Sequence, residues 1–202
     1  RKKTNIIAFI VPMVSHPFFA EMAGCIERYA YERGYKTLIC NSDSDIVKEK
    51  EYLELIERNQ VDGLIGAFYN TTIGEFIKPK YPLVTIDRRF DEIPYVASNH
   101  YEGGTEATKL LMSKGCKFIA HISGDLGTDN MGNLRSKAFM DTVVKSQVKY
   151  VLEETNIASF EAYKNLVYDF FDKYPDVDGI FAGSDILAAS IIYVAHAIGK
   201  QI

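Results

Sequence analysis

Short apolar runs alternate along the chain with longer stretches in which apolar residues recur every three or four positions. Residues 6–11, Ile-Ile-Ala-Phe-Ile-Val, form a continuous run that is typical of a buried strand. Helical spacing follows until Gly34, a residue type that commonly ends helices. The apolar positions of this helix are Phe18, Phe19, Met22, Ile26, Tyr29 and Ala30. The pattern predicts a strand followed by a helix that packs on it.

The same unit repeats to the end of the chain. Further strands are expected at residues 37–40, 63–68, 83–86, 95–98, 118–123, 149–152 and 179–182. Helices are expected after the capping oxygens of residues 41–45 and near 73–77, 101–114, 134–145, 160–173 and 185–198. This alternation predicts an α/β fold with parallel sheets and helices on both faces.

The length of the chain predicts two lobes. The weak strand at 95–98 falls near the middle of the 202 residues, and we place the crossover there. Two α/β lobes of about a hundred residues each, 1–98 and 99–202, suit that length better than one sheet of eight strands.

Composition and charge narrow the class of protein. With 47% hydrophobic and 25% charged residues, the chain can build a core. The 23 Lys and Arg residues against 27 Asp and Glu give a net charge of −4, which argues against a nucleic-acid-binding surface on this chain. No apolar run reaches the ~18 residues that a membrane span requires, so no membrane contact is expected. Cys25, Cys40 and Cys116 lack C-x-x-C spacing and are an odd number, so we expect buried thiols in a reducing, cytoplasmic compartment.

Enzyme motifs are missing from the sequence. It has no G-x-G-x-x-G, Walker A, H-E-x-x-H, G-x-S-x-G or zinc-ligand spacing, so no enzymatic activity, metal or cofactor is expected. His121 lies in the middle of an apolar run, where a hydrogen-bonded structural histidine is expected, and His196 is expected at the surface. The charged residues 87–89 follow a strand, which favours a binding or ion-pair role over catalysis.

The loops after the predicted strands are rich in Phe, Tyr, Asn, Asp and Arg. These loops are residues 13–19, 41–45, 68–72, 87–89, 99–102, 124–135 and 183–185. Ligands of open α/β sheets bind at this edge. Flat rings suit the C–H faces of a sugar, and carboxylates, amides and guanidinium groups suit its hydroxyls. Arg88 and Glu102 are therefore candidate ligand-binding residues.

Several segments, in order and spacing, resemble the LacI/GalR family of bacterial transcription regulators. They are residues 4–12, 16–21, 41–43, 50–53, 60–65, 84–88, 99–104, 122–124 and 178–185. The similar region is the effector-binding core related to periplasmic sugar-binding proteins. The resemblance covers the whole chain and implies the periplasmic-binding-protein-like type I fold, with two Rossmann-like lobes and a sugar or similar effector in the cleft between them.

The resemblance also implies roles for individual residues. In the first lobe it places Phe18 and Phe19 against the ligand, with Tyr69 and Asp87 nearby. In the second lobe it places Arg135 on the ligand hydroxyls, with Asp185 opposite. Because adjacent helical residues cannot both face the core squarely, at least one of the two phenylalanines should be free for the ligand.

The chain departs from the family pattern at several places. Asn99-His100 stands where the family usually has Asp-Asn, and Ser184-Asp185 stands where it has Asn-Asp. The family's DNA-binding headpiece is absent from this chain, as is the C-terminal part that completes the second sheet, so residues 99–202 are expected to form an incomplete lobe.

Two functions are compatible with this resemblance. The first is the effector-sensing domain of a transcriptional regulator, a repressor of a sugar-utilisation operon, which forms a homodimer and binds operator DNA through its headpiece. The alternative is a sugar-binding protein of a transport system. The scattered cysteines and the basic residues 1–3 favour the regulator.

Overall fold

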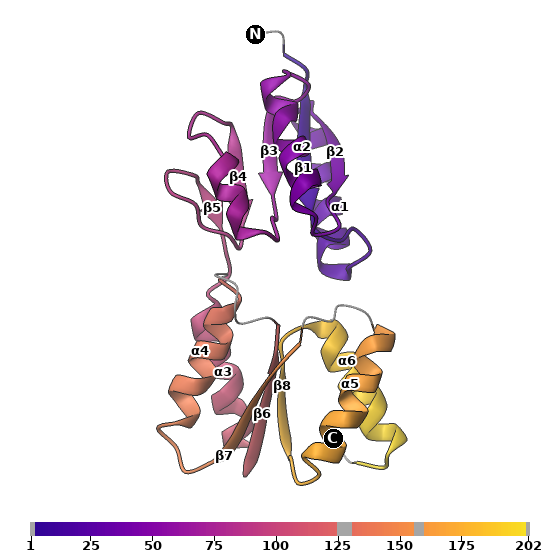
Figure 1. Cartoon of the computed structure of the whole chain (residues 1–202), viewed down its shortest axis with the longest axis vertical. Coiled ribbons are helices and arrows are strands. Elements are labelled where there is room, and N and C mark those ends of the chain that lie inside the picture. The colour runs from indigo at the N-terminus through magenta and orange to yellow at the C-terminus, as the bar shows by residue number, and fades with distance from the viewer. Residues whose placement is uncertain (1–2, 125–130, 156–159, 201–202) are drawn as a thin grey trace. The chain divides into compact units, whose positions relative to one another are not determined.

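The computed structural model describes residues 3–124, 131–155 and 160–200 (Figure 1). The chain forms two compact units, Arg1–Ser98 (unit 1) and Asn99–Ile202 (unit 2). Each unit has its own parallel sheet with helices on both faces. Within these described ranges, no helix is long and apolar enough to cross a lipid bilayer.

Unit 1 has a five-stranded parallel sheet in the order β2-β1-β3-β4-β5. The strands are β1 (Ile6–Val11), β2 (Lys36–Asn41), β3 (Gly63–Gly66), β4 (Leu83–Ile86) and β5 (Tyr95–Val96). The helical elements are α1 (Pro17–Glu32), α2 (Ile46–Glu57) and the 3-10 helix η1 (Thr71–Phe76). The predicted order of elements is therefore observed, with bounds that differ by a few residues.

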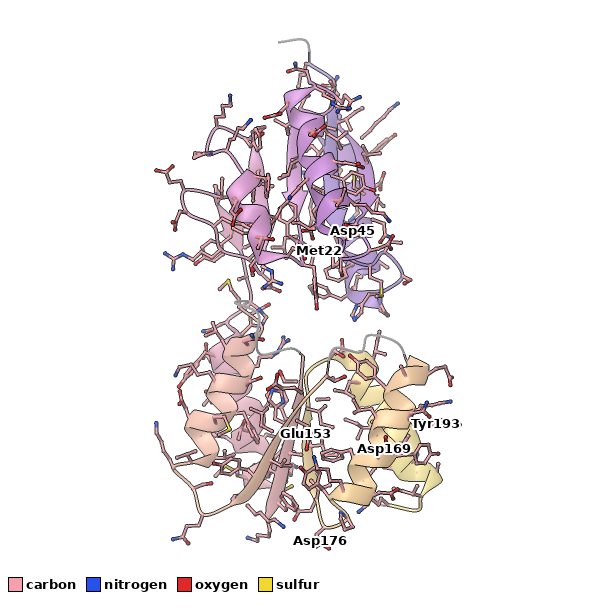
Figure 2. All side chains as sticks on the ribbon, in the orientation of Figure 1. Met22, Asp45, Glu153, Asp169, Asp176 and Tyr193 are labelled. Atoms are coloured by element: carbon pink, nitrogen blue, oxygen red, sulfur yellow. The ribbon has the colours of Figure 1, made fainter. Side chains whose placement is uncertain are left out.

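The interior strand β1 contributes side chains to both layers of the unit 1 core. Ala8 and Ile10 face α2 and η1, whereas Phe9 and Val11 face α1, as the two-residue period of a strand requires. Met22 of α1 packs in the second layer, and Figure 2 labels it together with Asp45, the N-cap of α2. Burial on both faces explains why β1 is a continuous apolar run.

Tyr29 is a correction to the predicted inward face of α1. Its side chain is 56% exposed, while Phe19, Met22, Ala23 and Ile26 contact the core. The cysteine prediction is also wrong in part. Cys40 is buried, and burial raises the pKa of its thiol to about 11, but Cys25 and Cys116 are partly exposed.

Unit 2 has a three-stranded parallel sheet in the order β7-β6-β8. The strands are β6 (Phe118–Ser123), β7 (Lys149–Glu154) and β8 (Gly179–Ala182). The helices are α3 (His100–Ser113), α4 (Asn133–Val143), α5 (Phe160–Lys173) and α6 (Asp185–Ala197). All six residues of β6 are buried, between α5 and α6 on one face and α3 and α4 on the other. On the edge strand β7, Glu153 accepts a hydrogen bond from Lys173 of α5 (Figure 2).

In both units, an aspartate side chain caps the backbone at the start of an interior strand in the same way. The sequence Val-Asp-Gly occurs at the start of β3 and again at the start of β8. The carboxylate of Asp62 accepts hydrogen bonds from the backbone N–H groups of residues 4 and 5, just before β1. The carboxylate of Asp178 accepts them from the N–H groups of residues 117 and 118, at the start of β6. All these distances are between 2.8 and 3.0 Å.

Candidate functional site

The predicted ligand residues of unit 1 follow three neighbouring strands of its sheet. Phe18 and Phe19 come after β1, Tyr69 after β3, and Asp87 and Arg88 after β4. These strands are adjacent and parallel, so the loops after them lie at one edge of the sheet. The structure thus gathers the aromatic and charged candidates of unit 1 at its carboxyl edge.

Of the two adjacent rings Phe18 and Phe19, one packs against the core and the other is exposed. Phe19 packs on the core layer that contains Phe9 and Val11. Phe18 is 46% exposed, and its ring meets that of Phe19 edge to face with centroids 5.1 Å apart. His16 caps α1 by accepting a hydrogen bond from the Phe18 N–H through Nδ1. Phe18 is therefore the ring left free at this edge.

Tyr69 and Arg88 lie together, but only Tyr69 is exposed. The Tyr69 side chain is 43% exposed, whereas Arg88 is 8% exposed. Arg88 Nε donates to the carbonyl of Phe68 at 2.8 Å, and Nη2 donates to the carbonyl of Tyr69 at 2.7 Å. The guanidinium group that the sequence assigns to the ligand thus also binds the backbone beneath Tyr69.

Glu49 is a residue that the sequence analysis missed. It is fully buried on α2, where Oε1 accepts the Tyr69 N–H at 2.8 Å and Oε2 accepts Nδ2 of Asn70 at 3.0 Å. Asn70 Nδ2 also donates to the carbonyl of Ser44. In the sequence, Glu49 resembles an ordinary acidic residue in the first turn of a helix, so no local pattern marks it as buried.

Asp87 has an unusual backbone conformation at the end of β4. Its φ of +51° lies in the left-handed region, which costs free energy for a residue other than glycine. Its N–H donates to the carbonyl of Val96, and its Oδ1 accepts the N–H of Ser98 at 3.3 Å. Backbone contacts with the β5 region therefore hold this carboxylate in place.

In unit 2, Glu102 and Asn99 form a reciprocal cap at the start of α3. Asn99 Oδ1 accepts the Glu102 N–H at 3.3 Å, and Asn99 Nδ2 donates to Glu102 Oε2 at 2.6 Å. The next residue, His100, is buried, and its Nδ1 lies 3.3 Å from Nη1 of Arg135. Because a guanidinium group can only donate, His100 Nδ1 is the acceptor.

Arg135 and Asp185 line one pocket of unit 2. Arg135 lies in the first turn of α4, and Asp185 begins α6 after the N-cap Ser184. The pocket has a volume of 430 Å³, and its other walls come from α3, β8 and the start of α6. Two of the predicted ligand residues, from different helices, therefore face the same space at the carboxyl end of β8.

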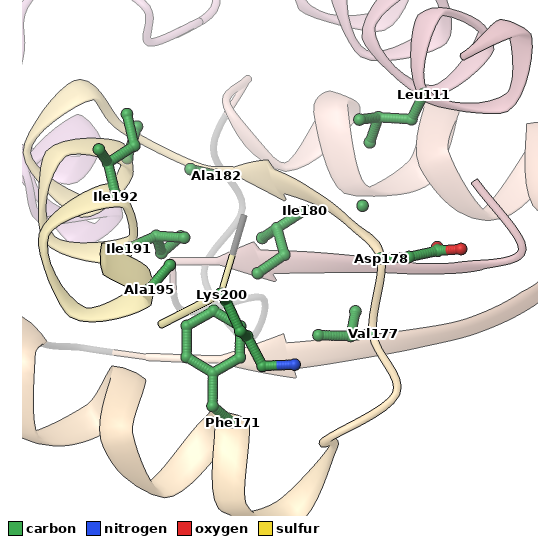
Figure 3. A pocket seen from close by; sticks show the side chains of 12 residues that line it. Leu111, Phe171, Val177, Asp178, Ile180, Ala182, Ile191, Ile192, Ala195 and Lys200 are labelled. Atoms are coloured by element: carbon green, nitrogen blue, oxygen red, sulfur yellow. The ribbon is translucent and has the colours of Figure 1, made fainter. Parts of the chain in front are cut away.

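An apolar pocket continues from there along β8 (Figure 3). It has a volume of 410 Å³ and shares Leu111, Ile180, Ala182 and Ala188 with the pocket of Arg135 and Asp185. Figure 3 shows apolar side chains from α6 around it, with Lys200 beside the ring of Phe171. None of the eight predicted ligand residues lines it. It follows β8, which pairs with β6 on one side and, among the residues that the structure describes, with no strand on the other.

Comparison with known proteins identifies the family. Residues 4–202 match the family described as periplasmic binding proteins and sugar binding domain of LacI family. The chain belongs to this family. The predicted family and the periplasmic-binding-protein-like fold are therefore confirmed.

Relatives of this LacI-family domain include operon repressors. It is 35% identical to the ribose operon repressor of Halalkalibacterium halodurans over 202 residues, which are all of this chain and 60% of that protein. It is 32% identical to the sucrose operon repressor of Streptococcus mutans, again over the whole chain and over 62% of the relative. The domain thus spans about three fifths of the length of these relatives.

Solved structures are similar over nearly the whole LacI-family domain. A periplasmic binding protein/LacI transcriptional regulator from Alkaliphilus metalliredigens, complexed with D-xylulofuranose, is 31% identical with a TM-score of 0.82. That match covers 98% of this chain and 74% of the other. A ribose operon repressor protein from Lactobacillus acidophilus is 28% identical with a TM-score of 0.83, over 100% of this chain and 75% of the other.

His121 of the LacI-family domain is a structural histidine, as the sequence predicts. It is fully buried on β6, and its Nδ1 lies 2.7 Å from the carbonyl of Phe181, so Nδ1 carries the proton. Nε2 then accepts the hydroxyl of Ser136, whose oxygen accepts the hydroxyl of Ser123. Burial lowers the pKa of His121 to about 4, so the ring is neutral near pH 7.

The remaining predictions concern metals and the loop after β6. Among the residues that the structure describes, no three His, Cys, Asp or Glu side chains are grouped to hold a metal ion. The predicted ligand loop 124–135 is described only at Gly124 and from Met131 onward, and residues 125–130 lie outside the described residues.

Proposed function

We propose that the chain is the effector-sensing domain of a transcriptional regulator, a repressor of a sugar-utilisation operon. The effector is a monosaccharide or a similar small molecule. The observations that carry this proposal are the exposed rings at the carboxyl edge of the unit 1 sheet and, separately, the guanidinium–carboxylate pocket at the carboxyl edge of the unit 2 sheet. Phe18 and Tyr69 offer apolar faces, and Arg135 and Asp185 offer groups for hydroxyls.

The other predicted ligand residues have supporting contacts within the protein. Asp87 is fixed by the β5 region, so its carboxylate is in place for a sugar hydroxyl. Phe19 stays under Phe18, and Arg88 and Glu102 already hold the loop after β3 and the start of α3. A sugar would have to share the hydrogen-bonding groups of Arg88 and Glu102 with the protein.

The names of relatives support the proposals that the effector is a sugar and that the regulator represses a sugar-utilisation operon. The ribose and sucrose operon repressors are named for sugars, and the solved relative from Alkaliphilus metalliredigens was crystallised with a five-carbon sugar. By analogy, we assign this cytoplasmic regulator a homodimeric state and an operator-binding headpiece outside the present chain. Two-fold symmetry in such a dimer matches a pseudo-palindromic operator.

The apolar pocket along β8 supports the assignment of residues 99–202 to an incomplete lobe. A strand edge with apolar residues on two flanking helices is a surface that another strand can cover. We assign this role to the C-terminal part of the longer regulator, since relatives extend well beyond the matched length.

Sugar binding is tested by thermal unfolding with D-ribose, D-xylulose, D-glucose, sucrose and fructose 1-phosphate at millimolar concentrations. A ligand at a hundredfold excess over its Kd stabilises the folded protein by about 2.7 kcal/mol, which is visible as a higher Tm. We expect at least one of these sugars to raise the Tm. A Tm that stays constant with the whole panel contradicts the proposed function.

Calorimetric titration of Arg135→Ala with a sugar that binds then tests the site. Loss of a charge-assisted hydrogen bond costs about 1.5–3 kcal/mol, so Kd should rise about 10- to 150-fold. Lys137→Ala, on the exposed side of the same helix, is the control and should bind as the wild type does. A Kd within twofold of wild type for Arg135→Ala would remove Arg135 from the site.

A further inference from the structure

One peptide group of unit 1 lies between a buried carboxylate and a buried guanidinium group. It joins Phe68 to Tyr69, directly after β3. Its C=O accepts a hydrogen bond from Arg88 Nε at 2.8 Å, and its N–H donates to Glu49 Oε1, also at 2.8 Å. The negative group lies at the N–H end of the peptide dipole and the positive group at the C=O end. Both charges therefore strengthen their hydrogen bonds.

The contacts that follow Tyr69 are held by the same two residues. Arg88 Nη2 donates to the Tyr69 carbonyl at 2.7 Å, and Glu49 Oε2 accepts the side-chain amide of Asn70 at 3.0 Å. The peptide groups on both sides of the Tyr69 Cα are thus fixed. Because φ and ψ are the two soft dihedrals of a residue, this fixes the direction in which the exposed Tyr69 side chain leaves the backbone.

The Phe68 ring anchors the loop after β3 in the core independently of Glu49 and Arg88. The Phe68 ring is buried in the core layer with Leu64 and Ile73, and it packs edge to face on Phe90. That apolar contact holds the loop to the sheet without help from a charge. Burying two charges is costly, so Glu49 and Arg88 are not needed merely to fill the core.

We propose that Glu49 and Arg88 are positioning residues that hold Tyr69 in its ligand-contacting orientation before any sugar arrives. This inference rests on the proposed function, in which the Tyr69 ring contacts the sugar. A loop whose backbone is already ordered loses less conformational freedom on binding, and the affinity is higher by that amount.

The first test measures the mobility of residue 69 without ligand. The chain has no tryptophan, so Tyr69→Trp introduces a single indole reporter. Glu49→Gln in this background puts an amide NH2 opposite one of two donors, the residue 69 N–H or the Asn70 amide. We expect lower indole fluorescence anisotropy and stronger acrylamide quenching. Glu51→Gln, an exposed carboxylate on the same helix, is the matched control and should leave both values unchanged.

Two further variants decide the question if the Glu49→Gln protein fails to fold. Arg88→Lys keeps the charge, but one ammonium group cannot reproduce the planar fork that binds two carbonyls. Asn70→Ala removes one hydrogen bond of Glu49 and no charge. Both should move anisotropy and quenching in the same direction as Glu49→Gln, with Asn70→Ala giving the smaller change. Values equal to those of the parent in folded Arg88→Lys and Asn70→Ala proteins would overturn the positioning role.

The second test uses D-ribose with the natural Tyr69 in place. Ordering one side chain on binding corresponds to roughly two- to tenfold in Kd, so we expect Glu49→Gln to raise the Kd by that factor and Glu51→Gln to leave it unchanged. An unchanged Kd in Glu49→Gln would overturn the inference. If neither D-ribose nor the other panel sugars bind the wild-type chain, the proposed function fails. The fluorescence measurement still decides the positioning role in that case.

Discussion

At the scale of single residues, buried polar groups of this domain are oriented by partners that can only accept or can only donate a hydrogen bond. His121 illustrates the rule, because the Phe181 carbonyl fixes its tautomer and thereby fixes the direction of the hydroxyl bonds of Ser136 and Ser123. The same reasoning makes His100 the acceptor for Arg135. The His121 ring is neutral near pH 7 in the folded protein.

The His121 environment predicts a pH-dependent stability. The pKa is about 4 in the folded protein against 6.5 for an ordinary histidine. Between these values the unfolded chain binds more protons, so the free energy of unfolding falls as pH falls, by about 3 kcal/mol for this group. Urea denaturation between pH 7 and pH 4 should show a steeper loss in the wild type than in His121→Asn. Equal slopes would show that His121 titrates alike in both states.

At the scale of elements, the position of Arg135 depends on how closely α3 approaches α4. A Cβ at Gly104 would lie 2.7 Å from the Arg135 carbonyl oxygen and 2.9 Å from its Cα, whereas a Cβ at Gly103 would meet open space. The two adjacent glycines of α3 therefore have different roles. Gly104 allows the helix contact, and Gly103 only adds backbone entropy to the unfolded chain.

This contrast predicts opposite effects of the same substitution at neighbouring positions. Gly104→Ala should destabilise the domain by about 1–3 kcal/mol, because the first turn of α4 must move. Gly103→Ala should stabilise it by about 0.5–1 kcal/mol through helix propensity. Urea denaturation of the two variants measures both effects. A Gly104→Ala protein as stable as Gly103→Ala would mean that the helix contact is looser than described.

The elements were largely predictable because their signals are local. The run at β1 and the three- and four-residue spacing of α1 and α6 depend on residues that are neighbours in sequence. Tyr29 was misplaced because helical spacing marks a stripe but not its width. Glu49 was missed because its burial depends on the loop after β3, twenty residues later, and no local pattern records such a contact.

At the scale of the whole molecule, the two units share one architecture, a parallel sheet with helices on both faces, but carry different side chains at the carboxyl edges of their sheets. Each has a buried interior strand, and backbone N–H groups at the start of that strand donate to the aspartate of a Val-Asp-Gly sequence. The carboxyl edges differ: unit 1 presents the exposed Phe18 ring on α1 and the exposed Tyr69 ring on a loop held by buried charges, and unit 2 presents an arginine and an aspartate. A sugar needs both kinds of contact, and each unit carries candidate ligand residues of one kind.

We propose that this domain senses a sugar for a DNA-binding regulator. Fluorescence anisotropy of labelled operator DNA tests it most directly, with the full-length protein and with the present chain, each with and without a sugar shown to bind. The chain carries a net charge of −4, and specific DNA complexes neutralise about six to ten phosphates. We therefore expect no binding by this chain alone at physiological salt. The full-length protein should bind tightly, with an affinity that changes when the sugar is added. Tight binding by the chain alone, or full-length binding indifferent to the sugar, would contradict the regulator and favour the transport alternative.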